Sequence, residues 1–309
     1  AWLGVGPALA QDDKSPITLL VGAASTMDAT ARLVAEHLKD ALGRPVVVQS
    51  KLGAGGRVAL GELKRAAPDG RVLMFSTSSP FAIYPHIYTK LDYDPVADFT
   101  PITGVAWFDL GLATGPATPA TDLAQLINWA KAKGNEVVYG AAPGAGSSSH
   151  FAGIALTLAA NLQMGVVPYK DSGAGITDIV AGRLPILITG TGALTEMHRA
   201  GRLRILATSG PQRSPIVKDV PTFVESGVNV NIINSAGLYG PAKMAPEFVA
   251  RLHTAMAPYF QKSDVREKMA LMGMSPEYAS PQQLAATLAD ERKKYQMLVK
   301  ASGYVAEAS

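Results

Sequence analysis

The chain of 309 residues has no cysteine and few charged side chains. Without thiols it can form no disulfide, zinc–thiolate site or cysteine nucleophile. Charged residues make up 17% of the sequence, the formal net charge is +3, and the basic residues are scattered without interleaved aromatic residues. A nucleic-acid-binding surface has the opposite pattern, with basic residues gathered on one face. The composition therefore excludes thiol chemistry and argues against nucleic acid as a partner.

Long apolar runs are also scarce, and the one at the start of the chain predicts export. Residues 1–10 are apolar and end in Ala8-Leu9-Ala10, a small-x-small pattern typical of the end of a secretory signal peptide. We expect residues 1–10 to be the remnant of such a peptide, and the mature, soluble protein to begin near Gln11. The alternative is a frayed or tag-derived end. No other apolar run approaches the roughly 20 residues of a membrane-spanning helix.

From residue 17 onwards, strand-like apolar runs alternate with segments of helical periodicity. Near-continuous apolar strands are typical of a parallel sheet that helices cover on both faces. The runs that we interpret as strands are residues 17–21, 46–48, 72–75, 137–139, 166–169, 184–188 and 203–208. Their β-α-β order predicts an α/β protein with doubly wound parallel sheets.

The chain is expected to cross between two lobes twice, near residues 105–112 and 232–238. Residues 11–107 and 238–309 then form lobe 1, and residues 108–237 form lobe 2. Two hinge strands suit lobes that close on a ligand, because a few linker residues can absorb the rotation. Near the end of the chain, Ser280-Pro281 supplies an N-cap and a first-turn proline for the last helix.

Two short loops rich in small and hydroxyl residues, residues 22–28 and 144–150, form the candidate binding site. Each follows a predicted strand and opens a predicted helix, where free backbone N–H groups and the positive end of the helix dipole can meet an anion. The candidate ligand-binding residues of these loops are Ala23, Ala24, Ser25, Thr26, Gly146, Ser147, Ser148, Ser149 and His150. The pattern predicts a small carboxylate held between the lobes; the alternative is a pair of ordinary tight turns.

Three residues in or near these loops have more than one interpretation. Asp28 is expected to be the N-cap of the first helix. Ser78 lies at the carboxyl end of a predicted strand, the side on which open α/β sheets bind ligands, although a solvated loop fits equally. His150 is the candidate base of an alternative hydrolase- or transferase-like enzyme, but no Gly-x-Ser-x-Gly motif or orienting carboxylate accompanies it.

Motifs for cofactors and metals are missing as well. The glycine clusters at residues 53–56 and 144–146 lack the third glycine of the dinucleotide fingerprint, and no Gly-Lys-Ser/Thr phosphate loop occurs. The other histidines are isolated, without the spacing of metal ligands. We therefore expect no cofactor and no metal. A monomer is expected too, because no coiled-coil pattern or exposed apolar stripe is evident.

Short motifs also occur in a fixed order along nearly the whole mature chain. They are Ala31-Arg32-Leu33, Gly43-Arg44-Pro45, Gly53-Ala54-Gly55-Gly56, Ala66-Ala67-Pro68-Asp69-Gly70, Tyr93-Asp94-Pro95, Asp98-Phe99-Thr100-Pro101, Ser148-Ser149-His150, Val167-Pro168-Tyr169-Lys170, Ala200-Gly201-Arg202-Leu203-Arg204, Arg213-Ser214-Pro215 and Asp219-Val220-Pro221-Thr222. This set resembles the periplasmic receptors of tripartite tricarboxylate transporters, often called Bug-type receptors. The ordered set, rather than any single motif, carries the resemblance.

The resemblance implies a two-lobed periplasmic-binding-protein (venus flytrap) fold with a doubly wound sheet in each lobe and two hinge crossings. It implies a solute-binding protein of the periplasm that captures an organic carboxylate for a membrane permease, without catalytic residues. In such receptors two loops hold a ligand carboxylate through backbone and hydroxyl groups, and they match residues 23–28 and 146–149 here. A receptor that reports its ligand to a membrane sensor is an alternative that stays open.

Departures from the family pattern bear on the ligand. The first loop is shorter than usual and lacks its aromatic residue, Thr189 stands where the family often has aspartate, and Ser235-Ala236 replaces a Trp-Tyr pair. We add Lys170, Asp171, Thr189 and Ser235 to the candidate ligand contacts. Fewer large side chains predict a roomier pocket, and hence a ligand bulkier than aspartate or malate, such as an aromatic or longer-chain carboxylate.

Overall fold

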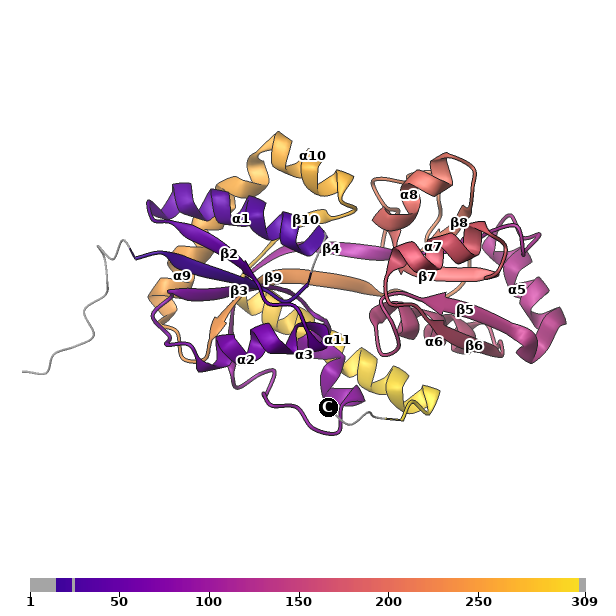
Figure 1. Ribbon diagram of the computed structural model, residues 1–309, viewed down its shortest axis with the longest axis horizontal. Coiled ribbons are helices and arrows are strands. Elements are labelled where there is room, and N and C mark those ends of the chain that lie inside the picture. Colours follow the sequence, from indigo (N-terminus) through magenta and orange to yellow (C-terminus); the bar gives the residue numbers. More distant parts are fainter. Residues whose placement is uncertain (1–14, 24–25, 306–309) are drawn as a thin grey trace, which may run out of the picture.

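The computed structural model describes residues 15–23 and 26–305, and it has two α/β lobes joined by long strands (Figure 1). The predicted signal-peptide remnant, residues 1–10, lies outside the described residues, as do Ala24 and Ser25 of the first candidate loop. No helix of the described chain is both long and apolar enough to cross a membrane.

The first lobe is built on a mixed sheet. Its strands, in spatial order, are β2 (Val46–Ser50), β1 (Ile17–Val21), β3 (Val72–Thr77), β9 (Ile233–Pro241), β4 (Phe99–Thr114) and β10 (Ser275–Ala279). The first three are parallel, and β9 runs antiparallel to both β3 and β4. Its helical segments are α1 (Thr26–Leu42), η1 (Ala54–Gly56), α2 (Arg57–Arg65), α3 (Ser79–Ala82), α4 (Tyr84–Ile87), α9 (Pro246–Met256), η3 (Ala257–Gln261) and α10 (Ser263–Leu271).

The second lobe repeats this plan. Its parallel strands are β6 (Met164–Pro168), β5 (Val137–Ala141) and β7 (Ile186–Gly190), and the far half of β4 pairs antiparallel with β7 and with β8 (Arg204–Thr208). Its helical segments are α5 (Leu123–Lys133), η2 (Gly134–Glu136), α6 (Ser148–Ala159), α7 (Ser172–Val180) and α8 (Thr191–Arg199). The central parallel strands β1 and β7 are rich in Ile, Leu and Val and are almost fully buried, as expected for strands covered by helices on both faces.

Strand β4 belongs to both sheets. Residues 99–109 pair with β9, whereas Leu110–Thr114 pair with β7 and, in part, with β8. β4 and β9 therefore carry the chain between the lobes at the two predicted crossings. The predicted fold class is confirmed, while the exact lobe boundaries stay a prediction.

Helix α11 (Pro281–Ser302) packs against both lobes. Leu284 and Leu288 pack in an apolar cluster of the first lobe with Leu20 and Leu60, whereas Tyr295 packs in the main cluster of the second lobe. The helix runs from the first lobe toward the second in Figure 1. Its predicted N-cap is confirmed: Ser280 accepts a hydrogen bond from the Gln283 N–H and completes a capping box.

The predicted cap of the first helix is wrong. α1 begins at Thr26, so Asp28 is its third residue, inside the helix. The Asp28 carboxylate instead accepts hydrogen bonds from Arg32, one turn further along, and from the Ser50 hydroxyl at the end of β2. A carboxylate in the first turn still interacts favourably with the helix dipole.

Candidate functional site

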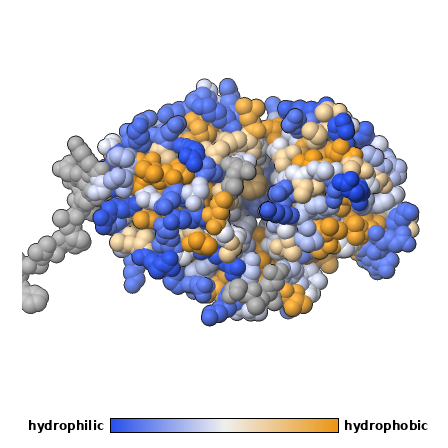
Figure 2. Space-filling view, viewed as in Figure 1, coloured by the Kyte–Doolittle hydropathy of each residue, from blue (hydrophilic) through white to orange (hydrophobic). Residues whose placement is uncertain are grey.

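Both candidate loops lie at the carboxyl ends of parallel strands. The first follows β1 and precedes α1, and the second follows β5 and precedes α6. In Figure 1 both loops are on the sides of their lobes that face each other, and Figure 2 shows the surface hollowed between the lobes. Because first-turn N–H groups lack partners inside their own helices, the starts of α1 and α6 are the candidate donors at this hollow.

The second loop is held by its own side chains. Ser147 is the N-cap of α6: its hydroxyl accepts from the His150 N–H at 3.2 Å and donates to the Gly144 carbonyl at 2.8 Å. The Ser149 hydroxyl donates to the Ala142 carbonyl at 2.8 Å. These bonds fix the direction of the helix start before any ligand arrives.

His150 is part of this internal scaffold. Its side chain is only 6% exposed, and its Nδ1 accepts a hydrogen bond from the Gly146 N–H at 3.0 Å. Burial lowers the pKa of His150, so the ring is neutral at pH 7. Because the Nδ1 lone pair is used by the loop itself, the imidazole orients backbone rather than a nucleophile.

Gly146 is required where the second loop meets the first lobe. Its φ is +70°, and a Cβ there would lie 2.7 Å from Cδ1 of Ile87 in α4. Tyr84, also in α4, donates its phenol to the Gly55 carbonyl at 3.0 Å. α4 therefore touches both the second loop and η1, a contact that the sequence analysis missed.

Ser148 differs from its neighbours in the second loop. It is 7% exposed, against 1% for Ser149, and within the described chain its hydroxyl has no hydrogen-bond partner. It is the first residue of α6, where N–H groups have no partner within the helix. This hydroxyl and the adjoining N–H groups form the most direct donor set for a carboxylate in the second lobe.

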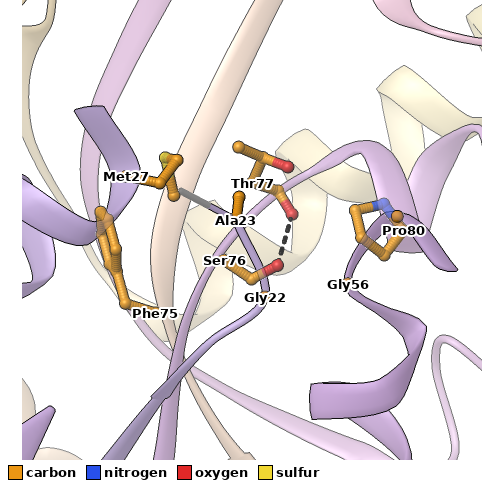
Figure 3. A pocket seen from close by; sticks show the side chains of 9 residues that line it. Gly22, Ala23, Met27, Gly56, Phe75, Ser76, Thr77 and Pro80 are labelled. Carbon is orange, nitrogen blue, oxygen red and sulfur yellow. Dashed lines mark hydrogen bonds between the residues drawn. The ribbon is translucent and has the colours of Figure 1, made fainter. Parts of the chain in front are cut away.

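The first loop borders a small pocket of about 30 Å³ in the first lobe (Figure 3). The pocket is lined by Gly22, Ala23, Met27, Gly55, Gly56, Phe75, Ser76, Thr77 and Pro80. Gly22 allows η1 to approach the end of β1, since a Cβ on Gly22 would lie 2.6 Å from the Gly56 Cα. Among the predicted site residues that the structure describes, only Ala23 lines this pocket, and Thr26 begins α1 next to it.

Ser78 and Ser235 lie buried beside this pocket, against a third residue. The Ser78 N–H donates to the Ser235 carbonyl at 2.8 Å, and the Ser235 hydroxyl donates to Oε1 of Glu291 at 3.2 Å. Burial raises the pKa of Glu291 to about 7, although hydrogen bonds from both serines act in the opposite direction. The sequence analysis missed Glu291, but a signal existed: it falls on the apolar stripe of α11, between Leu288 and Tyr295.

The remaining candidates lie around the start of α7. Lys170 is exposed, and Asp171 is the N-cap of α7, accepting from the Ala174 N–H at 2.9 Å. Thr189 is buried and shares a 2.7 Å hydrogen bond with Ser172 while donating to the Ala142 carbonyl at 3.2 Å. Thr189 thus connects β7 to the second loop, whereas Asp171 has a capping role that the sequence analysis did not anticipate.

Metal ligands do not gather in the described chain: no three His, Asp or Glu side chains lie close enough together to hold an ion. The polar groups near the hollow are mainly hydroxyls and backbone amides. Such groups suit the binding of an organic anion by hydrogen bonds.

Two α/β lobes, two crossing strands and helix N-termini facing a shared hollow define a periplasmic solute-binding protein. The chain belongs to the tripartite tricarboxylate transporter family receptors, whose profile matches residues 30–304. The resemblance inferred from the sequence is thus confirmed.

Relatives and solved structures agree with this assignment. BugT of Bordetella pertussis is 31% identical over 278 residues, covering 89% of this chain and 85% of BugT. A Rhodopseudomonas palustris protein solved with adipate is 27% identical, with a TM-score of 0.84 over 94% of this chain and 99% of that one. MatC from the same organism, solved with bound malate, is 26% identical, with a TM-score of 0.78 over 92% and 98% of the two chains.

Proposed function

We propose that this protein is a periplasmic receptor that captures an organic dicarboxylate between its lobes and delivers it to a membrane permease. The observation that carries the proposal is the start of α6, where the Ser148 hydroxyl, without a hydrogen-bond partner among the described residues, lies beside the first-turn N–H groups of a loop held by its own side chains. Amides and hydroxyls bind an anion without a fixed full charge that would hold it too tightly for release. Residues 1–10 would be the remnant of the export signal.

Capture would use both lobes, residues 11–107 with 238–309 and residues 108–237. The N-terminal turns of α1 and α6 would donate to a ligand carboxylate, and Thr189 would support the second loop from behind. Bending at β4 and β9 would let the lobes close, and the ligand would shift the population toward the closed form by binding it better.

The proposed ligand is a dicarboxylate longer than malate, with about six carbons. Gly22, Ala23, Gly55 and Gly56 are among the residues that line the first-lobe pocket, and Ser235-Ala236 stands in β9 where the family pattern has a Trp-Tyr pair. Adipate and malate are the ligands of the two solved neighbours, so the family accommodates different chain lengths. The smaller residues of this chain favour the longer acid.

Calorimetric titration against adipate, malate and benzoate tests the proposal, with the acids recovered afterwards to check that they are unchanged. We expect adipate to bind at least tenfold more tightly than malate, and every acid to be recovered intact. Tight binding of malate alone would overturn the proposed ligand length. Binding of none of a wider panel of acids, or turnover of any, would overturn the proposed function.

A further inference from the structure

The buried carboxyl of Glu291 joins three elements beside the proposed site. It lies on α11, is 6% exposed, and accepts a hydrogen bond from the Ser235 hydroxyl on β9, while Ser78 in the loop after β3 lies beside it. The Ser78 N–H is bonded in turn to the Ser235 carbonyl at 2.8 Å. A helix, a hinge strand and a loop of the first lobe are thus tied together through one side chain.

This contact is adjacent to the pocket. Ser76, Thr77 and Pro80, which flank Ser78 in the chain, all line it. α11 packs against α3, α6 and β4, and therefore connects the pocket to both lobes.

Oε2 of Glu291 has no hydrogen-bond partner among the described residues. A buried polar atom without a partner is uncommon in native proteins and points to a functional or proton-holding role. Glu291 also forms no salt bridge within the described chain, so no cation in contact compensates an ionised carboxylate.

The titratable groups around α11 leave Glu291 in an environment that disfavours charge. Among the described residues, Lys294 on α11 is the cation that favours its ionised form, and the phenols of Tyr239 on β9 and Tyr295 on α11 are buried beside Glu291. The other titratable groups nearby have different partners. On α11 itself, Arg292 donates to the Phe81 carbonyl, and His86 of α4 bonds to the Arg292 carbonyl. His150 of α6 bonds to Gly146, and Asp109 of β4 interacts with Thr191, Ser214 and Thr208.

We propose that Glu291 is a positioning residue for ligand capture, which holds the Ser78 loop against hinge strand β9 and makes affinity for a dianion depend on pH. The inference rests on the proposed function. In its neutral form the carboxyl supports the serines without repelling the ligand. When it ionises, it places a buried negative charge beside a site for an anion, so binding weakens.

Burial raises the pKa of Glu291 to about 7, which places this change near neutral pH. Below that value the folded protein holds a proton that the unfolded chain has already released. The free energy of unfolding therefore falls as pH rises from about 4.5 to 7, then levels off. A dianionic ligand favours the protonated form, so its affinity falls as pH rises through about 7.

The test compares adipate binding to the wild type, Glu291→Gln and Glu291→Ala at pH 6 and pH 8. If binding needs the neutral carboxyl, about ten in eleven molecules are competent at pH 6 and one in eleven at pH 8, a roughly tenfold loss of wild-type affinity. Glu291→Gln, which keeps a hydrogen-bonding side chain that cannot ionise, should vary less than twofold. At both pH values, Glu291→Ala should bind adipate about tenfold more weakly than the wild type does at pH 6. Asp290→Asn, exposed on the same helix, is the control and should retain the wild-type profile.

Urea unfolding of the ligand-free proteins over pH 5–8 gives a second readout that needs no ligand. The wild type should lose stability over this range relative to Glu291→Gln. Equal pH profiles of adipate binding for wild type and Glu291→Gln overturn the inference while leaving the proposed function intact. Failure of the wild type to bind any acid overturns both, and the unfolding profiles still show whether the buried carboxyl titrates.

Discussion

The two loops that face each other across the hollow are built in opposite ways. In the second loop, side-chain hydrogen bonds from Ser147, Ser149 and His150 fix the backbone. In the first, the described residues Gly22 and Ala23 contribute no side-chain bonds, and the backbone packs directly against Gly56 of η1. The second loop is organised by bonds within itself, whereas the described start of the first loop, Gly22 and Ala23, is organised by its lack of side-chain bulk.

Because of this difference, we expect the two loops to contribute differently to ligand binding. Donors held in place before the ligand arrives bind at a lower entropic cost, so the second loop suits the grip on a carboxylate that every ligand shares. A loop of small residues beside a pocket instead determines how much space remains for the rest of the ligand. Affinity should therefore depend on the second loop, and selectivity among acids on the first.

The largest effect is expected from replacing the free hydroxyl of the second loop. Ser148→Phe should weaken binding of all acids by more than about 100-fold, because it removes a donor to a charged group, worth roughly 1.5–3 kcal/mol, and occupies its space. Ser148→Ala removes the hydroxyl alone and should cost about tenfold. Calorimetry measures both.

Leu158→Phe is the control for Ser148, because Leu158 is on the same helix and 49% exposed. It should bind like the wild type. Circular dichroism and thermal unfolding report whether each variant folds. A folded Ser148→Ala variant with wild-type affinity for adipate would contradict the role of the second loop.

A smaller effect, on stability, is expected at His150. His150→Phe leaves the buried Gly146 N–H without an acceptor and should lower the free energy of unfolding by about 1–3 kcal/mol. His150→Asn can present an oxygen near the position of Nδ1 and should recover part of that loss. Urea unfolding at pH 7.5 measures the difference, and equal stability of all three proteins would show that the bond does not hold the loop.

Comparing the wild type with His150→Asn also predicts how the free energy of unfolding depends on pH. Burial lowers the pKa of the folded imidazole, so the unfolded chain binds a proton first as pH falls. Wild-type stability should therefore decline below about pH 6.5, the ordinary histidine value, and His150→Asn should decline less.

The smallest effect is a shift in selectivity at the first loop. Ala23→Leu adds apolar volume at the pocket and should weaken adipate by about tenfold more than malate, the scale of a one- or two-carbon discrimination. Ala29→Leu, exposed on α1, is the control and should change neither affinity. If Ala23→Leu weakens the binding of both acids equally, the first loop contributes to affinity for every acid rather than to selectivity between them.

The sequence was informative wherever a pattern is local. Hydrophobic periodicity located the strands on either side of both loops, and Ser280-Pro281 marked the start of α11, because caps and strand–helix alternation depend on neighbours in the chain. Asp28 was placed wrongly because its partner, Ser50, is on another strand. A residue that could cap a helix can instead bond to residues far away in the chain, and a single sequence does not show those partners.

The site was predicted less completely than the fold for the same reason. The sequence marked the two loops as candidates, but η1 and α4 lie against them, and Glu291 against Ser78 and Ser235, only through tertiary contacts. Glu291 belongs to a helix whose apolar stripe predicts burial, and an acidic residue on such a stripe can be noticed from sequence. That it meets Ser78 and Ser235 follows only from the packing of α11 against the hinge.

Strand β4 has a consequence for how this protein can be altered. Over residues 106–114, it passes from its pairing with β9 to its pairing with β7 without a register shift. Inserting or deleting a single residue near Asp109 would turn every following side chain of the strand to the opposite face in the second lobe. Lobes exchanged between relatives to combine ligand preferences should therefore be joined outside β4, with this strand inherited whole from one parent.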